Sequence, residues 1–290
     1  MTRSTVAIVG AGRVGTALGV LLARAGYPVV AASGREATRE RLSRHLPDVP
    51  LRAPGEAASA ADVVVLGVPD DEIAGAAEEL AAAGAFREGQ LVAHLSGSAS
   101  LEVLAAAREA GTRAISLHPL QTFPDVEAAL ERLPGSAIAV TALDDEGYRL
   151  AEELATAVGA SPFRIADEDK PLYHAAAVFS SNYLAVVEAI AERLFARAGL
   201  DDPLPRFAPL AEATLANVLR MGPVAALTGP AVRGDAGTIR RNLEALEAAA
   251  PEFVAAYVAL ADAAVELAAD AGRLENGDRG RVEEALLPWR

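Results

Sequence analysis

A glycine-rich turn between a short apolar run and an apolar helical stretch constrains this chain more than any other feature. The run Val6-Ala7-Ile8-Val9 leads directly into Gly10-Ala11-Gly12-Arg13-Val14-Gly15. In a strand–turn–helix unit, the first glycine permits a tight turn, the second lets backbone approach a pyrophosphate, and the third allows close helix–strand packing. The helix N-terminus adds free N–H groups and a positive dipole. The residues expected to bind a dinucleotide are Gly10, Gly12, Arg13, Val14 and Gly15. A purely structural tight turn is the alternative.

Apolar runs alternate with helical stretches through the first half of the chain. This alternation is typical of a mostly parallel sheet covered by helices on both faces, an α/β fold of the Rossmann type. Strands are predicted at Val6–Val9, Pro28–Ala32, Val63–Leu66, Leu91–Leu95, Ala114–Leu117, Ala137–Val140 and Pro162–Ile165. Helices are predicted at Val14–Ala25, Asp70–Ala83, Leu101–Ala110 and Glu146–Val158.

After Ile165 the predicted strands end and helices predominate. Acidic residues at 167–169 suit a helix start, and Pro171 suits a first helical turn. Helices are expected at about 171–198, 206–221, 235–249, 251–272 and 278–286. We therefore expect a dinucleotide-binding domain at residues 1–166 and an all-α domain for substrate binding and dimerisation at residues 167–290.

Composition and charge exclude several classes of protein. Hydrophobic residues make up 52% of the chain and charged residues 23%, which excludes a disordered protein. The net charge of −14 repels phosphate backbones and anionic lipid, so nucleic acids are not expected partners. Because the chain has no cysteine, disulfides, thiolate catalysis and cysteine zinc sites are excluded, and no metal site is expected. With neither a long apolar span nor a signal peptide, a cytoplasmic protein is expected, without membrane partners.

The end of the second predicted strand distinguishes between the two nicotinamide dinucleotides. An NAD site normally carries Asp or Glu there to bind the ribose hydroxyls. Here the chain reads Ala31-Ala32-Ser33-Gly34-Arg35, with Arg39 and Arg41 nearby. A hydroxyl and a guanidinium suit a 2′-phosphate, so we predict NADP (NADPH) bound through Ser33 and Arg35. The alternative is that these arginines form the solvated face of the next helix.

Three further strand ends carry candidate residues. After Val63–Leu66, the pair Val68-Pro69 would turn the chain over the nicotinamide ribose, while helix capping accounts equally well for Asp70. Ser96 and His118 follow the next two strands, where parallel sheets bind ligands. Imidazole moves protons near neutral pH, so His118 is a candidate for proton transfer. A structural hydrogen bond that holds the Pro119 turn is the alternative for His118.

The first helix of the second half carries polar residues on an apolar background. Helical spacing places His174 and Asn182 on one face, with Lys170 at the leading end. Such a stripe is costly to bury unless it faces a wet cleft, although bonds to loops of the first domain would also satisfy it. Lys170 is the only lysine among 26 basic residues, which points to a position that needs a compact, titratable ammonium. Chance survival at a surface position is the alternative.

Several of these motifs resemble those of known proteins. The glycine turn, the Val68-Pro69-Asp70 segment and the all-α second half resemble the superfamily of 6-phosphogluconate dehydrogenase, ketopantoate reductase and pyrroline-5-carboxylate reductase. Ser96 with His118-Pro119 also resembles prephenate dehydrogenase. A narrower resemblance is to bacterial oxidoreductases that pair a Rossmann-like NADP-binding domain with a C-terminal domain of unknown function. The motifs that carry it are Leu117–Phe123, Tyr173–Ala177 with Asn182-Tyr183, and Leu227–Pro230 with Arg233–Asp235.

The resemblance implies an NADP-type site without an established substrate, and a homodimer formed through the helical domain. Our main hypothesis is an NADP-dependent oxidoreductase of a small carbonyl or imine compound, and superfamily analogy adds a 2-keto acid such as ketopantoate as a refinement. In 3-hydroxyacid dehydrogenases a helix lysine is the general acid and an asparagine follows four residues later, whereas His174 stands four residues after Lys170 here. The expected catalytic set is His118, Lys170, His174, Ser96 and Asn182. A non-catalytic dinucleotide sensor or scaffold is the alternative function.

Overall fold

The computed structural model describes residues 3–290, which form two compact units that divide between Ser181 and Asn182. The sequence placed this division at residue 166. The structure keeps helix α8 (Lys170–Ser180) in the first unit, because Lys170 and Tyr173 hydrogen-bond to residues at the ends of the sheet strands.

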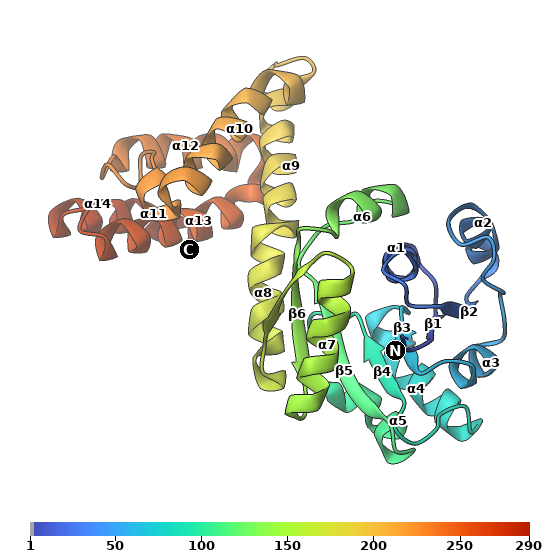
Figure 1. Cartoon of the computed structure of the whole chain (residues 1–290). Helices are drawn as coiled ribbons and strands as arrows, with labels where there is room; N and C mark the ends of the chain where they lie inside the picture. The colour runs from blue at the N-terminus through green and yellow to red at the C-terminus, as the bar shows by residue number, and fades with distance from the viewer. Residues whose placement is uncertain (1–2) are drawn as a thin grey trace. The chain divides into compact units, whose positions relative to one another are not determined.

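The first unit is built on a seven-stranded sheet with the order β2-β1-β3-β4-β5-β6-β7 (Figure 1). Every neighbouring pair is parallel except β5 and β6. Apolar runs such as Val63–Leu66 are buried along their whole length, because helices cover both faces of the sheet. The predicted α/β fold and its strands are confirmed. The strand bounds are β1 Val6–Val9, β2 Val29–Ser33, β3 Val63–Leu66, β4 Leu91–His94, β5 Arg113–Pro119, β6 Ala137–Ala142 and β7 Ser161–Arg164.

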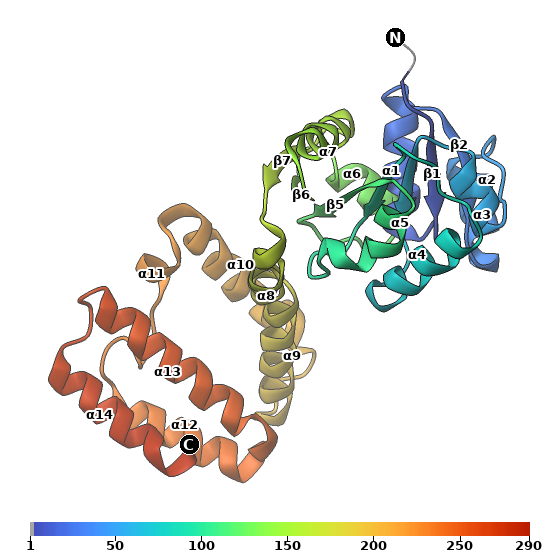
Figure 2. The same ribbon diagram turned by 90° about the horizontal axis from the view of Figure 1, so that it is seen from below.

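Two sets of helices cover the two faces of this sheet (Figure 2). One set contributes Leu18, Leu42 and Leu154 to its core and comprises α1 (Arg13–Arg24), α2 (Glu36–His45), α6 (Val126–Arg132) and α7 (Asp145–Ala157). The other contributes Ala57 and Leu80 and comprises α3 (Pro54–Ser59), α4 (Ile73–Ala82) and α5 (Ala105–Glu109). The 3-10 turns η1 (Asp70–Glu72) and η2 (Leu101–Leu104) precede α4 and α5.

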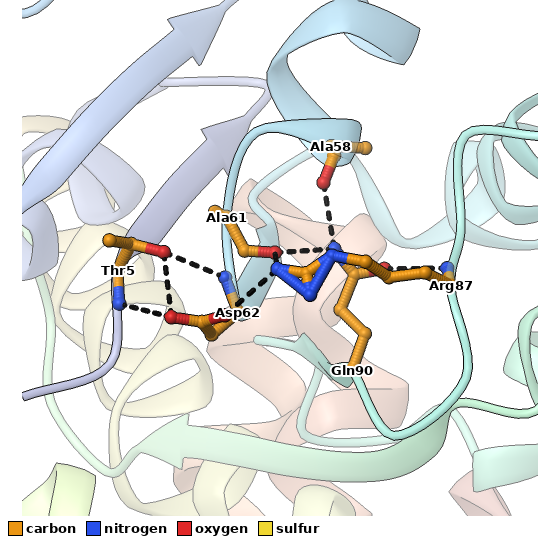
Figure 3. A network of polar contacts seen from close by, with 6 residues as sticks. All are labelled: Thr5, Ala58, Ala61, Asp62, Arg87 and Gln90. Atoms are coloured by element: carbon orange, nitrogen blue, oxygen red, sulfur yellow. Dashed lines mark hydrogen bonds and ion pairs between the residues drawn. The ribbon is translucent and has the colours of Figure 1, made fainter.

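A polar network joins the loops at the amino edge of the sheet (Figure 3). Oδ2 of Asp62 accepts hydrogen bonds from the backbone N and the hydroxyl of Thr5, both at 2.9 Å. Arg87 donates to Oδ1 of Asp62 at 2.8 Å, and the buried Gln90 amide donates to the carbonyl of Ala61 at 2.6 Å. The backbone hydrogen bond from Thr5 is the main reason why the pKa of Asp62 lies below its usual range. These bonds fix the starts of β1, β3 and β4.

The second unit is entirely helical, as predicted. Its core lies between the last three long helices and includes Leu243, Val265 and Val282. The helix expected at 171–198 is interrupted, because Ser181 adopts φ −127° and ψ −65° and α9 begins at Asn182. No helix among residues 3–290 is both long and apolar enough to cross a membrane. The helix bounds are α9 Asn182–Arg197, α10 Pro203–Met221, α11 Pro223–Ala226, α12 Ala236–Ala249, α13 Val254–Asp270 and α14 Asn276–Leu286.

Candidate active site

Two cavities of the first unit share a wall at the carboxyl edge of the sheet. The first has a volume of about 840 Å³ and borders the ends of β1 and β2, where Arg35 and Arg41 lie. The second has a volume of about 600 Å³ and is lined by Asp70 and His118, at the ends of β3 and β5. A ligand that filled both would cross the glycine turn. The residues that line both cavities are Gly12, Gly67, Val68 and Pro69.

The glycines of the turn are required for different reasons. Gly10 has a φ of +81°, and a Cβ there would lie 2.5 Å from Cγ1 of Val68. A Cβ on Gly15 would lie 3.1 Å from Cγ2 of Ile8, so close packing of α1 on β1 excludes a larger residue. A Cβ on Gly12 would meet no atom closer than 3.7 Å, so protein packing leaves room for a side chain there.

Gly12 is also the N-cap of α1, and no side chain caps this helix. Its backbone therefore faces two cavities beside unpaired N–H groups of the first helical turn. This arrangement fits a pyrophosphate, which would use both the space and the hydrogen-bond donors. The predicted residues Arg13 and Val14 line the second cavity, next to Gly12.

Ser33, a predicted phosphate ligand, also holds the glycine turn. Its side chain is buried, and its Oγ accepts a hydrogen bond from the Gly10 backbone N at 3.3 Å. Its carbonyl oxygen accepts bonds from the backbone N of Gly10 and Ala11. Ser33 borders the first cavity, because β2 ends directly beside the turn. Its hydroxyl accepts the bond from Gly10 and keeps its own O–H to donate, so its role as a phosphate ligand stays a prediction.

Three arginines and two glutamates line the first cavity. The Arg35 side chain is 84% exposed and pairs with Oε1 of Glu72 at 2.8 Å. Arg41 donates to the carbonyl of Ala11 at 2.8 Å and so lies against the glycine turn. Arg39 does not line the cavity, whereas Arg52, which sequence reasoning missed, does. The backbone N of Arg52 donates to the Ala32 carbonyl, and this contact places Arg52 beside β2. No local sequence motif predicts it.

His118 lies in the wall of the second cavity and contacts Tyr173 of α8. The Tyr173 hydroxyl lies 2.7 Å from Nδ1 of His118, and the two rings meet edge to face. Burial, with the charges of Lys170 and His174 adding to it, lowers the pKa of His118 to about 4. Burial raises the pKa of Tyr173 to about 12. At neutral pH the site therefore contains a neutral imidazole beside a protonated phenol, and a phenol that donates to Nδ1 leaves the ring proton on Nε2.

Lys170 lies behind the site and does not line either cavity. Its side chain is only 2% exposed, and Nζ donates to the Ser96 carbonyl at 3.0 Å and to Oγ of Ser116 at 2.8 Å. Burial lowers the pKa of Lys170 to about 8, against the opposing charge of Asp167. The sequence predicted a proton donor here. In the structure Lys170 supports the Ser96 turn and places a charge behind His118, and its role as a proton donor stays a prediction.

Ser96 and Asp70 form a hydrogen-bonded pair at the same edge. The Ser96 hydroxyl, itself buried, donates to Oδ2 of Asp70 at 2.5 Å and accepts from the Ala99 backbone N at 3.0 Å. Asp70 does not cap η1 or α4, in contrast to the capping role considered above. Sequence reasoning thus missed Asp70 as a cavity residue, although its place just after the strand end and Pro69 was the available signal.

His174 and Asn182 complete the predicted set. The rings of His174 and His118 are 6.1 Å apart, and both approach Gly97. A Cβ on Gly97 would lie 2.7 Å from Nε2 of His118 and 2.8 Å from Cδ2 of His174. His174 therefore packs beside His118, although it does not line the cavity. Asn182 opens α9 in the second unit, and its role stays a prediction.

Comparison with known proteins identifies both halves of the chain. Residues 1–119 match the Rossmann-like domain, and residues 136–264 match the Domain of unknown function DUF2520. A search of curated proteins found no match.

Solved structures share the fold over most of the chain. A provisionally designated NADP oxidoreductase from Bacteroides fragilis is 23% identical, with a TM-score of 0.74 over 91% of this chain and 99% of that one. A pyrroline-5-carboxylate reductase from Coxiella burnetii is 20% identical, with a TM-score of 0.53 over 92% and 98%. A reductive aminase from Aspergillus terreus, in complex with NADPH and ethyl levulinate, is 21% identical, with a TM-score of 0.62 over 98% and 99%. The chain therefore belongs to the proteins that pair a Rossmann-like domain with a DUF2520 domain, as the resemblance in its sequence predicted.

Proposed function

We propose that this protein is an NADPH-dependent oxidoreductase that reduces a small carbonyl or imine compound. The observation that carries the proposal is the shared wall at Gly12, which connects a cavity with three arginines to a cavity that contains His118. The reductase and reductive aminase of the same fold support it. When bound, NADPH would supply a hydride from its nicotinamide ring.

The residues of the chain would hold the dinucleotide at three points. Arg35 and Arg41 would bind the 2′-phosphate, and Arg35 would exchange its exposed Glu72 partner for the more highly charged phosphate. The backbone N–H groups after Gly12 would bind the pyrophosphate. Val68-Pro69 would contact the nicotinamide ribose at the boundary of the two cavities.

His118 would act on the heteroatom that gains electron density during reduction. A neutral imidazole that carries its proton on Nε2 donates a hydrogen bond without adding a full charge to the site. Tyr173 would fix this tautomer through Nδ1, and Lys170 would hold the neighbouring Ser96 turn. A non-catalytic sensor has no need of an imidazole in the cavity wall, and this favours the enzyme over the sensor.

Two measurements test the proposed function. Calorimetry with NADPH and NADH tests the cofactor, and we expect tighter binding of NADPH. A screen of NADPH oxidation against 2-keto acids, ketopantoate among them, simple ketones and cyclic imines tests the reaction. Turnover of any of these classes supports the enzyme. Failure to bind NADPH contradicts the proposal, and tight NADPH binding without turnover of any class favours the sensor.

We also propose that the second unit forms a homodimer. Helix α9 has no buried residue, although Leu184, Val187 and Phe195 are large and apolar. Helix α10 buries only Phe207, while Leu210 and Leu219 are 66% and 78% exposed. Soluble monomers rarely expose an apolar surface of this extent. A second copy of the chain presents the same apolar helices, so a symmetric pair would cover both surfaces at once.

A further inference from the structure

The second cavity carries charge of opposite sign on its two sides. Its charged wall residues, among those the structure describes, are Arg13 and Asp70. Arg13 also lines a separate cavity of about 250 Å³ with Glu40, Arg44 and Asp125, so it lies on the side toward α2 and α6. Asp70 lies on the other side, where it bonds to Ser96 and where its charge acts on His118. A ligand group beside His118 therefore meets a carboxylate.

Among the described residues, protein donors bond to one oxygen of the Asp70 carboxylate and not to the other. Oδ2 accepts hydrogen bonds from the hydroxyls of Ser96 at 2.5 Å and Ser98 at 3.4 Å. Across residues 3–290, no protein donor is bonded to Oδ1. Because Ser96 is itself held by the Ala99 N–H and by Lys170, the carboxylate is preorganised and retains one free acceptor oxygen. Such a group suits a ligand N–H, above all a charged one.

The positive charge of Lys170 does not remove the preference of Asp70 for a cationic ligand. Lys170 directs its ammonium to the Ser96 carbonyl and Ser116 rather than to the cavity. His118 is neutral at pH 7 because burial holds its pKa at about 4. A 2-keto acid that placed its carboxylate on this side would face Asp70 with like charge, whereas an iminium nitrogen would be attracted.

We propose that the second cavity binds substrates whose reacting nitrogen is positively charged, namely iminium ions, and that Asp70 binds their N–H group. This inference rests on the proposed NADPH-dependent reduction. A hydride from NADPH forms the new C–H bond at the iminium carbon, the C=N π electrons become the nitrogen lone pair, and NADP⁺ remains. The neutral amine then takes up a proton from solvent, and Asp70 binds the resulting ammonium product in the same way.

The test combines turnover with product binding. Wild type, Asp70→Asn and the control Asp71→Asn are compared with 1-pyrroline, 3,4-dihydroisoquinoline, ketopantoate and cyclohexanone. Asp71 is the adjacent exposed residue of η1 and lines neither cavity. Pyrrolidine binding to the protein with NADP⁺ is measured by calorimetry in parallel. Asparagine keeps the size of the aspartate side chain, and its amide oxygen can still accept the hydrogen bond from the Ser96 hydroxyl. We therefore expect Asp70→Asn to fold, and its melting temperature checks this.

We expect the imines to give the highest kcat/KM in wild type. Asp70→Asn should lower kcat/KM for imines about 10- to 100-fold and weaken pyrrolidine binding about tenfold, the loss expected for one charge-assisted bond. NADPH affinity and the Asp71→Asn variant should be unchanged. Faster reduction of ketopantoate than of either imine, or pyrrolidine binding that Asp70→Asn leaves intact, overturns the inference. In those cases NADPH binding and keto acid turnover would still uphold the proposed function, so the two failures are distinguishable.

Discussion

The Tyr173 hydroxyl lies 2.7 Å from Nδ1 of His118, and this contact joins the first turns of α8 to the end of β5. The tyrosine ring also meets Phe163 of β7 edge to face, so its position is fixed by packing as well as by the hydrogen bond. A buried imidazole whose tautomer is set by a rigid neighbour is oriented before any ligand arrives. The contact connects α8 directly to the cavity wall.

Replacement of Tyr173 by phenylalanine should lower activity without affecting cofactor binding. The variant keeps the ring packing but leaves Nδ1 of His118 without its partner, so the imidazole loses its fixed tautomer. One such bond is worth roughly 1 kcal/mol, which corresponds to a loss in kcat of about fivefold or more. Steady-state kinetics and NADPH calorimetry measure the two effects, with Tyr257→Phe in the second unit as the control. Equal kcat for wild type and Tyr173→Phe would show that the hydroxyl does not act on His118.

Charge reversal at Arg35 should shift the cofactor preference toward NADH. Arg35→Asp removes a phosphate ligand and places a carboxylate where NAD sites bind the ribose hydroxyls. We expect NADPH affinity to fall roughly tenfold or more. Arg39→Asp is the matched control, because Arg39 carries the same charge in the helix that follows Arg35 but does not line the cavity. A similar loss in both variants would indicate a general electrostatic effect rather than a phosphate site.

The buried Lys170 should make folding stability depend on pH in a specific window. Its pKa is about 8 in the folded protein and near 10.4 when unfolded, so between these values the unfolded chain binds more protons. The free energy of unfolding should therefore gain a contribution that rises as pH increases from 8 to about 10.5, at up to roughly 1.4 kcal/mol per pH unit.

Urea titrations of wild type and Lys170→Met measure this contribution as the difference between the two slopes. Subtraction removes the effects of Tyr27 and Tyr173, whose pKa values are both raised to about 12. The same variant should raise the pKa of His118 toward its usual value, since it removes a nearby positive charge, and NMR titration detects this change. If the free energy of unfolding depended on pH equally in the two proteins, the pKa of Lys170 would be the same in the folded and unfolded states. That result would contradict the burial of its ammonium.

Alanine at Gly97 should disrupt the packing of the two histidines. The added methyl group would lie under 3 Å from both imidazoles, so one ring must move, at a cost of roughly 1–3 kcal/mol in stability. Gly75→Ala in α4 is a control that should raise stability instead. Its Cβ would meet nothing within 4 Å, and alanine favours a helix over glycine by about 1 kcal/mol. Thermal unfolding and kcat measure both variants. Unchanged stability and activity in Gly97→Ala would contradict the observed close approach.

Light scattering should give a dimer of about twice the 29.8 kDa chain mass. Leu219 is 78% exposed on α10, and a charge at this position should weaken association by roughly tenfold or more if the surface is buried in the dimer. Leu219→Glu should therefore shift the protein toward monomer at micromolar concentration, whereas Leu143→Glu, at an exposed leucine of the first unit, should not. A wild-type monomer at that concentration would contradict the homodimer.

The sequence predicts features that depend on neighbouring residues. The strands are recognisable because residues buried on both faces form continuous apolar runs, as at Val63–Leu66. The glycine turn is recognisable because the strand, the three glycines and the helix follow one another directly in the sequence. A helix was expected after β2 but its bounds were not predicted, because only Thr38 and Leu42 are buried in α2 and the apolar period is weak.

Features that depend on distant contacts were not predictable in the same way. The burial of Lys170 results from bonds to Ser96 and Ser116, which lie far away in the sequence. The role of Asp70 likewise depends on Ser96, and the break before Asn182 replaces one expected helix by two. Local periodicity carries no information about which strand end a helix side chain reaches.

A crystal structure of the protein with NADP⁺ would show whether the two cavities form one dinucleotide site. We expect the 2′-phosphate beside Arg35 and Arg41, the pyrophosphate at Gly12, and the nicotinamide in the second cavity next to His118. A dinucleotide whose nicotinamide lies outside that cavity, or whose 2′-phosphate contacts neither arginine, would contradict it.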